Sequence, residues 1–195
     1  MEFFGKVKGF MFSPTKTFDA SKPDTLRDAL KHYLGILLIY ATFSSAISGY
    51  LVATMGLGAV TIYGRLAQVP VHLLQGFGAS GAILMFVMMV VSGVIVIFLG
   101  SSYFHMFVYA FGGRKGVIQT EKAFMYGYTP LLMAWIPVVN IIALIWSIVL
   151  EVIGIRQLHE ISTVRAVAAH VAAAIIPIVV AFVCIAAILL MRGTV

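Results

Sequence analysis

The 30 residues from Ala82 to Phe111, AILMFVMMVVSGVIVIFLGSSYFHMFVYAF, contain no Lys, Arg, Asp or Glu. A helix of about 20 mostly apolar residues crosses the ~30 Å hydrocarbon core of a bilayer, so this stretch predicts a membrane-spanning helix. The rest of the chain has a similar character, because 62% of its 195 residues are hydrophobic and 10% are charged. Ordinary soluble domains have about 25% charged residues. We therefore expect an all-α integral membrane protein.

The number of spans depends on the stretch from Ala123 to His159. It is either one broken helix or two short helices that reverse at Pro137 to Asn140, because proline lacks an amide donor and asparagine favours turns and caps. We favour the hairpin, and we also expect an interfacial helix at about 63–74 after the first span. The predicted bundle then has five spans, at about 33–55, 82–111, 123–136, 139–157 and 167–191.

The positive charges predict the orientation of this bundle. With five spans, eleven of the thirteen Lys and Arg residues lie on one face, and only Arg65 and Arg192 lie opposite. The positive-inside rule then places the N-terminus in the cytoplasm and the C-terminus outside, in a multi-pass protein of the cell membrane. A four-span arrangement still places ten of the thirteen on one face, so charge alone leaves the hairpin open.

Residues 1–31 form a predicted cytoplasmic arm before the membrane domain of residues 32–195. Apolar side chains recur at helical spacing in the arm, at Phe3, Phe4, Val7, Phe10 and Met11. We expect a short amphipathic helix in the membrane interface, with its rings near the acyl boundary; the alternative is a partly ordered tail. Cations of the arm and loops are expected to contact anionic lipid headgroups or a partner, namely Lys6, Lys8, Arg114, Lys115, Arg156 and Arg165.

Ionisable side chains inside a membrane cost of order 3 kcal/mol and are functional candidates. We expect Glu151 and His105 to lie at comparable depth, where they could form a polar pair along a proton or small-ion path. The alternatives are a structural hydrogen bond that orders the helices, or an interfacial Glu151 capped by Arg156. The candidate intramembrane polar site comprises Glu151, His105, Asn140 and Tyr128.

Catalytic and metal-binding motifs are missing from the sequence. The five histidines form no HxxxH or HExxH pattern, and the single Cys184 allows no intramolecular disulfide. The chain also lacks a Gly-x-Ser-x-Gly elbow, a Walker loop and a dinucleotide fingerprint. We therefore expect no enzyme activity, no cofactor and no bound metal. The net charge of +6 is explained by lipid headgroups, and we do not expect a nucleic-acid partner.

Four short segments resemble the Yip (Ypt-interacting protein) domain family in its short prokaryotic form. They are Phe12-Ser13-Pro14 followed by Phe18, Gly127-Tyr128-Thr129-Pro130, Trp146, and Leu158-His159-Glu160-Ile161-Ser162 followed by Arg165-Ala166. The resemblance covers roughly residues 7–190 and implies a five-helix membrane domain with a cytoplasmic N-terminus. Eukaryotic relatives are associated with Rab-type small GTPases, but the arm of about thirty residues makes a GTPase partner doubtful.

The sequence thus leads to one main functional expectation and one runner-up. The main expectation is a non-enzymatic, oligomeric Yip-family protein that organises the membrane or scaffolds a membrane-protein partner. The runner-up is a small-solute or ion transporter built on Glu151 and His105, and lipid handling through a sideways groove is a third. A water-accessible cavity at Glu151 would favour transport, whereas a sealed bundle would favour scaffolding.

Overall fold

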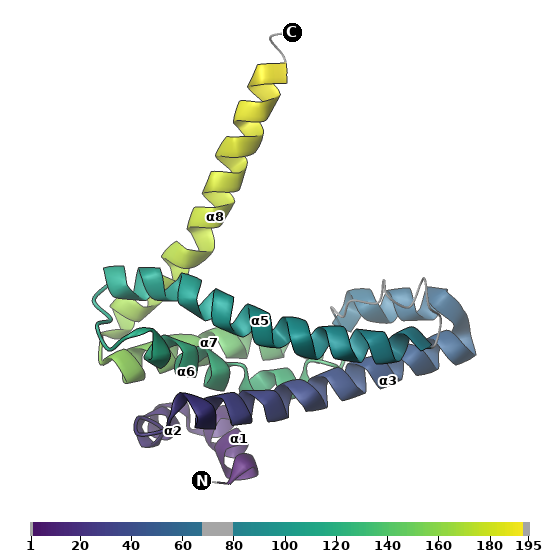
Figure 1. Cartoon of the computed structure of the whole chain (residues 1–195), viewed down its shortest axis with the longest axis horizontal. Coiled ribbons are helices and arrows are strands. Elements are labelled where there is room, and N and C mark those ends of the chain that lie inside the picture. Colours follow the sequence, from purple (N-terminus) through teal and green to yellow (C-terminus); the bar gives the residue numbers. More distant parts are fainter. Residues whose placement is uncertain (1, 68–79, 193–195) are drawn as a thin grey trace.

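The structure, a computed structural model, describes residues 2–67 and 80–192. All regular elements in these two ranges are helices, as predicted (Figure 1). In chain order they are α1 (Phe3–Phe12), α2 (Pro14–Ala20), α3 (Leu26–Ala67), α5 (Gly81–Ala110), α6 (Val117–Gly127), the 3-10 helix η2 (Thr129–Met133), α7 (Val139–His159) and α8 (Thr163–Arg192).

Three of the described helices are long and apolar enough to cross a membrane, namely α3, α5 and α7. The observed α5 differs from the predicted span 82–111 by one residue at each end. In α8, residues Thr163–Val179 form a shorter apolar helix among those whose side chains are described. Long apolar helices are favoured in lipid because they satisfy every backbone hydrogen bond internally.

Helix α3 turns sharply at Gly56, one residue after the predicted end of the first span. Gly56 has φ +77° and ψ −179°, a backbone conformation that residues other than glycine rarely adopt. The following segment folds back, so that Val60 packs with Ala41 of the first limb and with Met85 of α5 (Figure 1). Of the interfacial helix expected at 63–74, residues 63–67 are helical, and the remainder lies outside the described residues.

The predicted hairpin is present, but its first arm is not a single helix. Helices α6 and α7 pack antiparallel, because Gly127 lies against Glu151 while Thr120 bonds to His159 near the other end of the pair. The predicted helix at 123–136 was wrong in its bounds, since α6 ends at Gly127 and η2 follows. Pro130 has no amide hydrogen to continue an α-helix, and the Thr129 hydroxyl donates to the Tyr126 carbonyl instead, at 2.6 Å.

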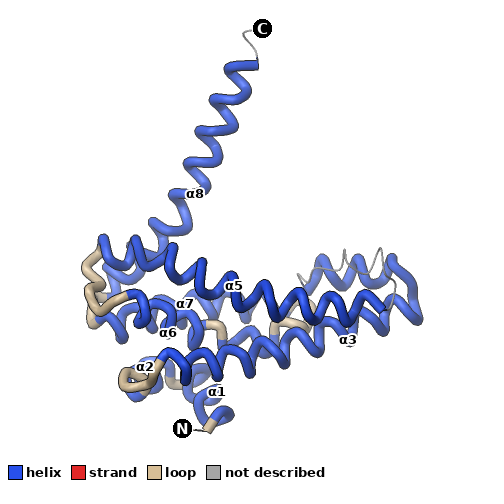
Figure 2. The backbone as a smooth tube through the Cα atoms, in the orientation of Figure 1, coloured by secondary structure: helices blue, strands red, loops and turns tan. Residues whose placement is uncertain are grey.

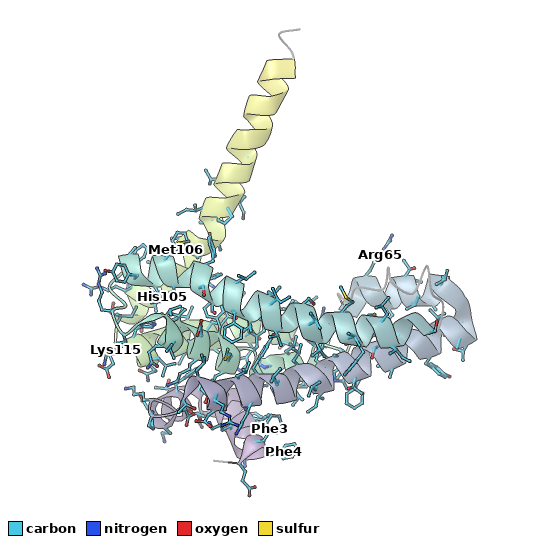
Figure 3. All side chains as sticks on the ribbon, in the orientation of Figure 1. Phe3, Phe4, Arg65, His105, Met106 and Lys115 are labelled. Atoms are coloured by element: carbon cyan, nitrogen blue, oxygen red, sulfur yellow. The ribbon has the colours of Figure 1, made fainter. Side chains whose placement is uncertain are left out.

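The segments predicted to be cytoplasmic meet at one end of the molecule. Figure 2 shows the loops before α3 and after α5 at this end. Glu160, which follows α7, is ion-paired with Lys115 of the loop between α5 and α6 and lies 3.7 Å from Lys22 of the loop before α3. Arg65 lies toward the opposite end, where the positive-inside argument placed it (Figure 3).

Candidate functional site

The N-terminal helix α1 has an inward face and an outward face. Phe3, Lys6 and Phe10 turn toward the bundle, and Phe10 is 0% exposed. Phe4 and Phe12, which are 77% and 79% exposed, point outward with Lys8 between them. The arm was predicted as one apolar face with all its rings near lipid, and this was wrong for Phe10. It belongs to the protein core because the hairpin supplies an aromatic partner.

That partner is Tyr126 of α6. The Phe10 ring stacks on it with centroids 4.7 Å apart, and the Phe18 ring of α2 packs edge-on against Phe10 at 4.8 Å. Phe18 also lies against Gly154 of α7, where an added Cβ would be 2.8 Å from the ring. The arm is therefore docked on both helices of the hairpin by aromatic packing.

The same tyrosine also forms polar contacts. Lys6, Asp24 and Tyr126 are joined by hydrogen bonds, and we call these three residues the clasp. The Lys6 ammonium donates to Asp24 Oδ2 at 2.7 Å and to the Tyr126 hydroxyl at 3.1 Å. The Tyr126 hydroxyl donates to Asp24 Oδ2 at 2.5 Å. Burial alone would raise the pKa of Asp24, but the hydrogen bonds from Lys6 and Tyr126 outweigh it and lower that pKa below its ordinary value.

A buried charge lies next to the clasp, in the part of α6 that begins earlier than predicted. Lys122 is 1% exposed, and its ammonium donates to the Lys22 carbonyl at 3.0 Å. Lys22 thus supplies a hydrogen-bond partner that lies a hundred residues away in the sequence. Sequence reasoning treated Lys122 as a loop residue because it could not detect this partner.

His32 of α3 completes the polar layer under the arm. Its Nε2 lies 2.9 Å from the Thr129 hydroxyl oxygen, whose own hydrogen is donated to the Tyr126 carbonyl. Thr129 therefore accepts the bond, and Nε2 of His32 carries the proton. In the neutral ring this leaves Nδ1 as an acceptor, and no described residue donates to it.

A cavity of about 530 Å³ opens between the arm and the first turns of α3. Five of its six lining residues are charged or imidazole side chains, and the set is Phe3, Lys6, Asp24, Asp28, Lys31 and His32. Sequence reasoning identified only Lys6 among the candidate site residues here. The signal that could have revealed the others is the run of charges at Asp24, Asp28 and Lys31, directly before an uncharged stretch.

The predicted intramembrane acid, Glu151, is 5% exposed and faces His170 of α8. The distance from Glu151 Oε2 to His170 Nε2 is 3.7 Å, which is longer than a hydrogen bond. The His170 ring packs between Phe104 and Phe124, at centroid distances of 4.9 and 6.3 Å. This side of Glu151 is therefore lined by aromatic and imidazole rings.

His105 has a different partner, so the structure does not bring it together with Glu151. Its Nδ1 lies 2.8 Å from the Thr120 hydroxyl, which lies 2.9 Å from Nε2 of the buried His159. His159 and Glu151 are eight residues apart on α7, or about 12 Å at 1.5 Å per residue. The two imidazoles and the threonine form a separate polar chain at the end of the bundle that holds Lys115.

The remaining predicted intramembrane residues, Asn140 and Tyr128, differ in their distance from Glu151. Asn140 is 1% exposed, and neither of its side-chain polar atoms has a partner among the described residues. It lies eleven residues from Glu151 on α7, about 16 Å away. Tyr128 packs edge-on against Tyr33 of α3, with ring centroids 6.1 Å apart. Tyr128 directly follows Gly127, which lies against Glu151, so it is near this carboxyl, whereas His105 and Asn140 lie apart from it.

The predicted surface cations of the loops have partners within the protein. Arg114 lies over the Tyr109 ring at 3.6 Å, and Arg156 donates to the Thr163 hydroxyl at 3.3 Å. Lys115 pairs with the exposed Glu160 and lowers the pKa of that carboxyl. Arg165 lies close to Gly112, across the gap between the two loops. Within 2–67 and 80–192, no group of three His, Cys, Asp or Glu side chains is placed to hold a metal ion.

Comparison with protein families found a match to the Yip1 domain over residues 8–188. Comparisons with curated proteins and with solved structures found no match. The segments that carry the sequence resemblance take part in docking the arm, because Phe18 is buried beside Tyr126 and Thr129 binds His32. The family match covers most of the sequence and confirms the resemblance. The chain belongs to the Yip1 domain family and is a membrane protein with apolar helices.

Proposed function

We propose that this protein is a non-enzymatic organiser of the cell membrane that gathers anionic lipids at its cytoplasmic face. The observation that carries the proposal is the outward face of α1, where Phe4 and Phe12 flank Lys8 on a helix docked to the bundle. Aromatic rings enter the interface between headgroups and acyl chains, and lysine attracts anionic headgroups. Docking through Phe10 holds this face rigidly beside the membrane domain.

The proposed topology has five crossings, with a cytoplasmic N-terminus and an external C-terminus. The first limb of α3, then α5, α6 with η2, and α7 follow one another in alternating directions, and α8 leaves the bundle at a steep angle to them (Figure 1). From Val117 to Met133, α6 and η2 are about 26 Å long at 1.5 and 2.0 Å per residue, and this length includes the first turns of α6, where Lys122 bonds to the arm, so it is the shortest of the proposed crossings. The cationic arm and loops then share the cytoplasmic face.

The packing around Glu151 supports organisation over transport. A Cβ added to Gly127 would lie 2.6 Å from Glu151 Cγ and 3.2 Å from the Glu151 amide nitrogen, so α6 and α7 are in close contact there. The cavities of about 530 and 260 Å³ are lined by other residues. A proton or ion path needs water at its ionisable groups, and this close contact leaves little room for water on one side of the carboxyl.

Transport is the second candidate, and the contact between Glu151 and His170 favours it. A carboxyl and an imidazole within 4 Å can exchange a proton when water reaches them. Full-length protein in liposomes that contain a pH-sensitive dye separates the two candidates. We expect liposomes that contain wild type or Glu151→Gln to show no more proton flux than empty liposomes. A proton flux in wild type that Glu151→Gln abolishes would replace our proposal with transport.

Lipid selectivity tests the proposal directly. Full-length protein is reconstituted in bilayers of phosphatidylcholine with either spin-labelled phosphatidylglycerol or spin-labelled phosphatidylcholine, and the immobilised fraction is measured. We expect selectivity for the anionic label, reduced up to about fivefold by Lys8→Gln, because one lysine contributes about 1 kcal/mol near an anionic surface. Arg65→Gln, near the opposite end, is the matched control. Equal immobilisation of both labels by wild type would refute the proposal.

A further inference from the structure

The polar cavity under the arm is built on the side of α1 opposite to the face that we assign to anionic lipid. It is lined by two lysines, two aspartates, one histidine and one phenylalanine. Its charged side chains therefore sum to zero. Its volume of about 530 Å³ falls in the range of about 300–1,000 Å³ that is usual for small-molecule sites.

The acceptors of this lining are arranged for a donor that carries several hydrogens. The hydrogen bonds from Lys6 and Tyr126 to Asp24 end on Oδ2, and Asp28 likewise receives the amide and hydroxyl of Thr25 on Oδ2, at 3.0 and 2.6 Å. The Oδ1 atom of each carboxylate can still accept a bond. His32 lines the same cavity but is only 4% exposed, and its Nδ1 atom is buried. A primary ammonium has three N–H donors and can donate to both carboxylates.

The cations of the lining are arranged for an anion. Lys6 has three N–H donors and uses two of them, on Asp24 and Tyr126. Lys31 is exposed, and it forms no ion pair within the described part of the chain. These donors are the kind that bind phosphate oxygens through charge-assisted hydrogen bonds.

The position of the cavity indicates which molecule brings the two groups together. Lys31 is the last charged residue before the uncharged stretch from His32 to Gly64, so the cavity lies where α3 enters the apolar layer. We propose that this cavity binds a ligand with a primary ammonium and a phosphate, the chemistry of an ethanolamine phospholipid headgroup. This inference goes beyond the proposed function, because it concerns a different surface and a zwitterionic ligand.

Choline and glycerol headgroups provide the contrast. A quaternary ammonium has no N–H donor and is normally held by aromatic faces, whereas this lining offers carboxylates and a single phenylalanine. A phosphatidylglycerol headgroup brings the phosphate without a cation for Asp24 and Asp28. The site should therefore rank ethanolamine above both of the other headgroups.

The test uses the full-length protein, stripped of lipid in detergent and mixed with equal amounts of phosphatidylethanolamine, phosphatidylcholine and phosphatidylglycerol. Native mass spectrometry measures the lipid retained. We expect phosphatidylethanolamine to be retained about tenfold better than phosphatidylcholine, in line with the loss of a charge-assisted hydrogen bond. Soluble phosphoethanolamine should compete, and phosphocholine should not. Binding of soluble phosphoethanolamine without retention of the lipid would support the same chemistry with a water-soluble ligand.

Variants locate the binding. Lys31→Gln removes a cation that forms no ion pair among the described residues, and Asp28→Asn removes a negative charge that attracts the ammonium; each should weaken binding about tenfold. Lys16→Gln, an exposed change on α2 outside the lining, should have no effect. Equal retention of the three lipids, or unchanged binding by Lys31→Gln, would overturn the inference. Selectivity for phosphatidylglycerol at the outer face of the arm is a separate measurement, so the two proposals can fail independently.

Discussion

Replacing Phe10 with alanine tests whether the arm is an integral part of the bundle. The side chain is 0% exposed and contacts the rings of Tyr126 and Phe18, at 4.7 and 4.8 Å. A buried Phe→Ala change costs about 3–5 kcal/mol. At 1.4 kcal/mol per tenfold change, the equilibrium between docked and undocked arm should shift by roughly two to three and a half powers of ten.

Limited proteolysis of the full-length protein in nanodiscs measures this shift, because the arm contains Lys6, Lys8 and Lys16 as trypsin sites. We expect Phe10→Ala to accelerate cleavage by about a hundredfold or more, since the protease acts on the undocked population. Phe12→Ala is the matched control, because that ring is 79% exposed. Equal cleavage rates for Phe10→Ala, Phe12→Ala and wild type would refute the docked arm.

Three further predictions concern the clasp, the hairpin and the histidine chain. Folding lowers the pKa of Asp24, so the contribution of this carboxylate to stability should be full above its ordinary pKa of 3.8 and lost as the pH falls through the lower folded pKa. The melting temperatures of wild type and Asp24→Asn, measured between pH 7 and 2, should therefore converge at the acid end. A constant difference would count against the clasp. Gly127→Ala should destabilise the bundle by about 1–3 kcal/mol through its clash with Glu151, whereas Gly100→Ala, whose Cβ meets nothing within 4 Å, should melt like wild type. Thr120→Val should lower stability by about 1–3 kcal/mol because it removes the hydroxyl between two imidazoles, Thr120→Ser should retain most of it, and equal melting of both variants would contradict the bridge.

Sequence reasoning reached the features that depend on local composition. The uncharged stretch at Ala82 predicted α5 almost to the residue, and the glycine after Met55 coincides with the turn in α3. Pro137 and Asn140 predicted the reversal between α6 and α7. These features follow from hydropathy and from backbone preferences that are the same in any fold.

The features that it missed depend on contacts between distant segments. Lys122 was predicted to be a loop residue, because the sequence does not reveal that the Lys22 carbonyl accepts a hydrogen bond from it. Glu151 was predicted to pair with His105, but His170 of α8 lies next to it instead. Depth in the membrane can be predicted from position in a helix, whereas the direction in which a side chain faces depends on packing. The sequence pattern likewise predicted a helical arm without revealing that Phe10 belongs to the protein core.

Opposite exposure of the two chain ends is the most direct test of the membrane arrangement on which the cytoplasmic sites depend. Single cysteines are introduced as Glu2→Cys and Val195→Cys in a Cys184→Ser background, and a membrane-impermeant maleimide is added to intact cells. The five-crossing account predicts that the cysteine at position 195 is labelled in intact cells and that the one at position 2 is labelled only after lysis. Labelling of both positions from the same side would contradict it.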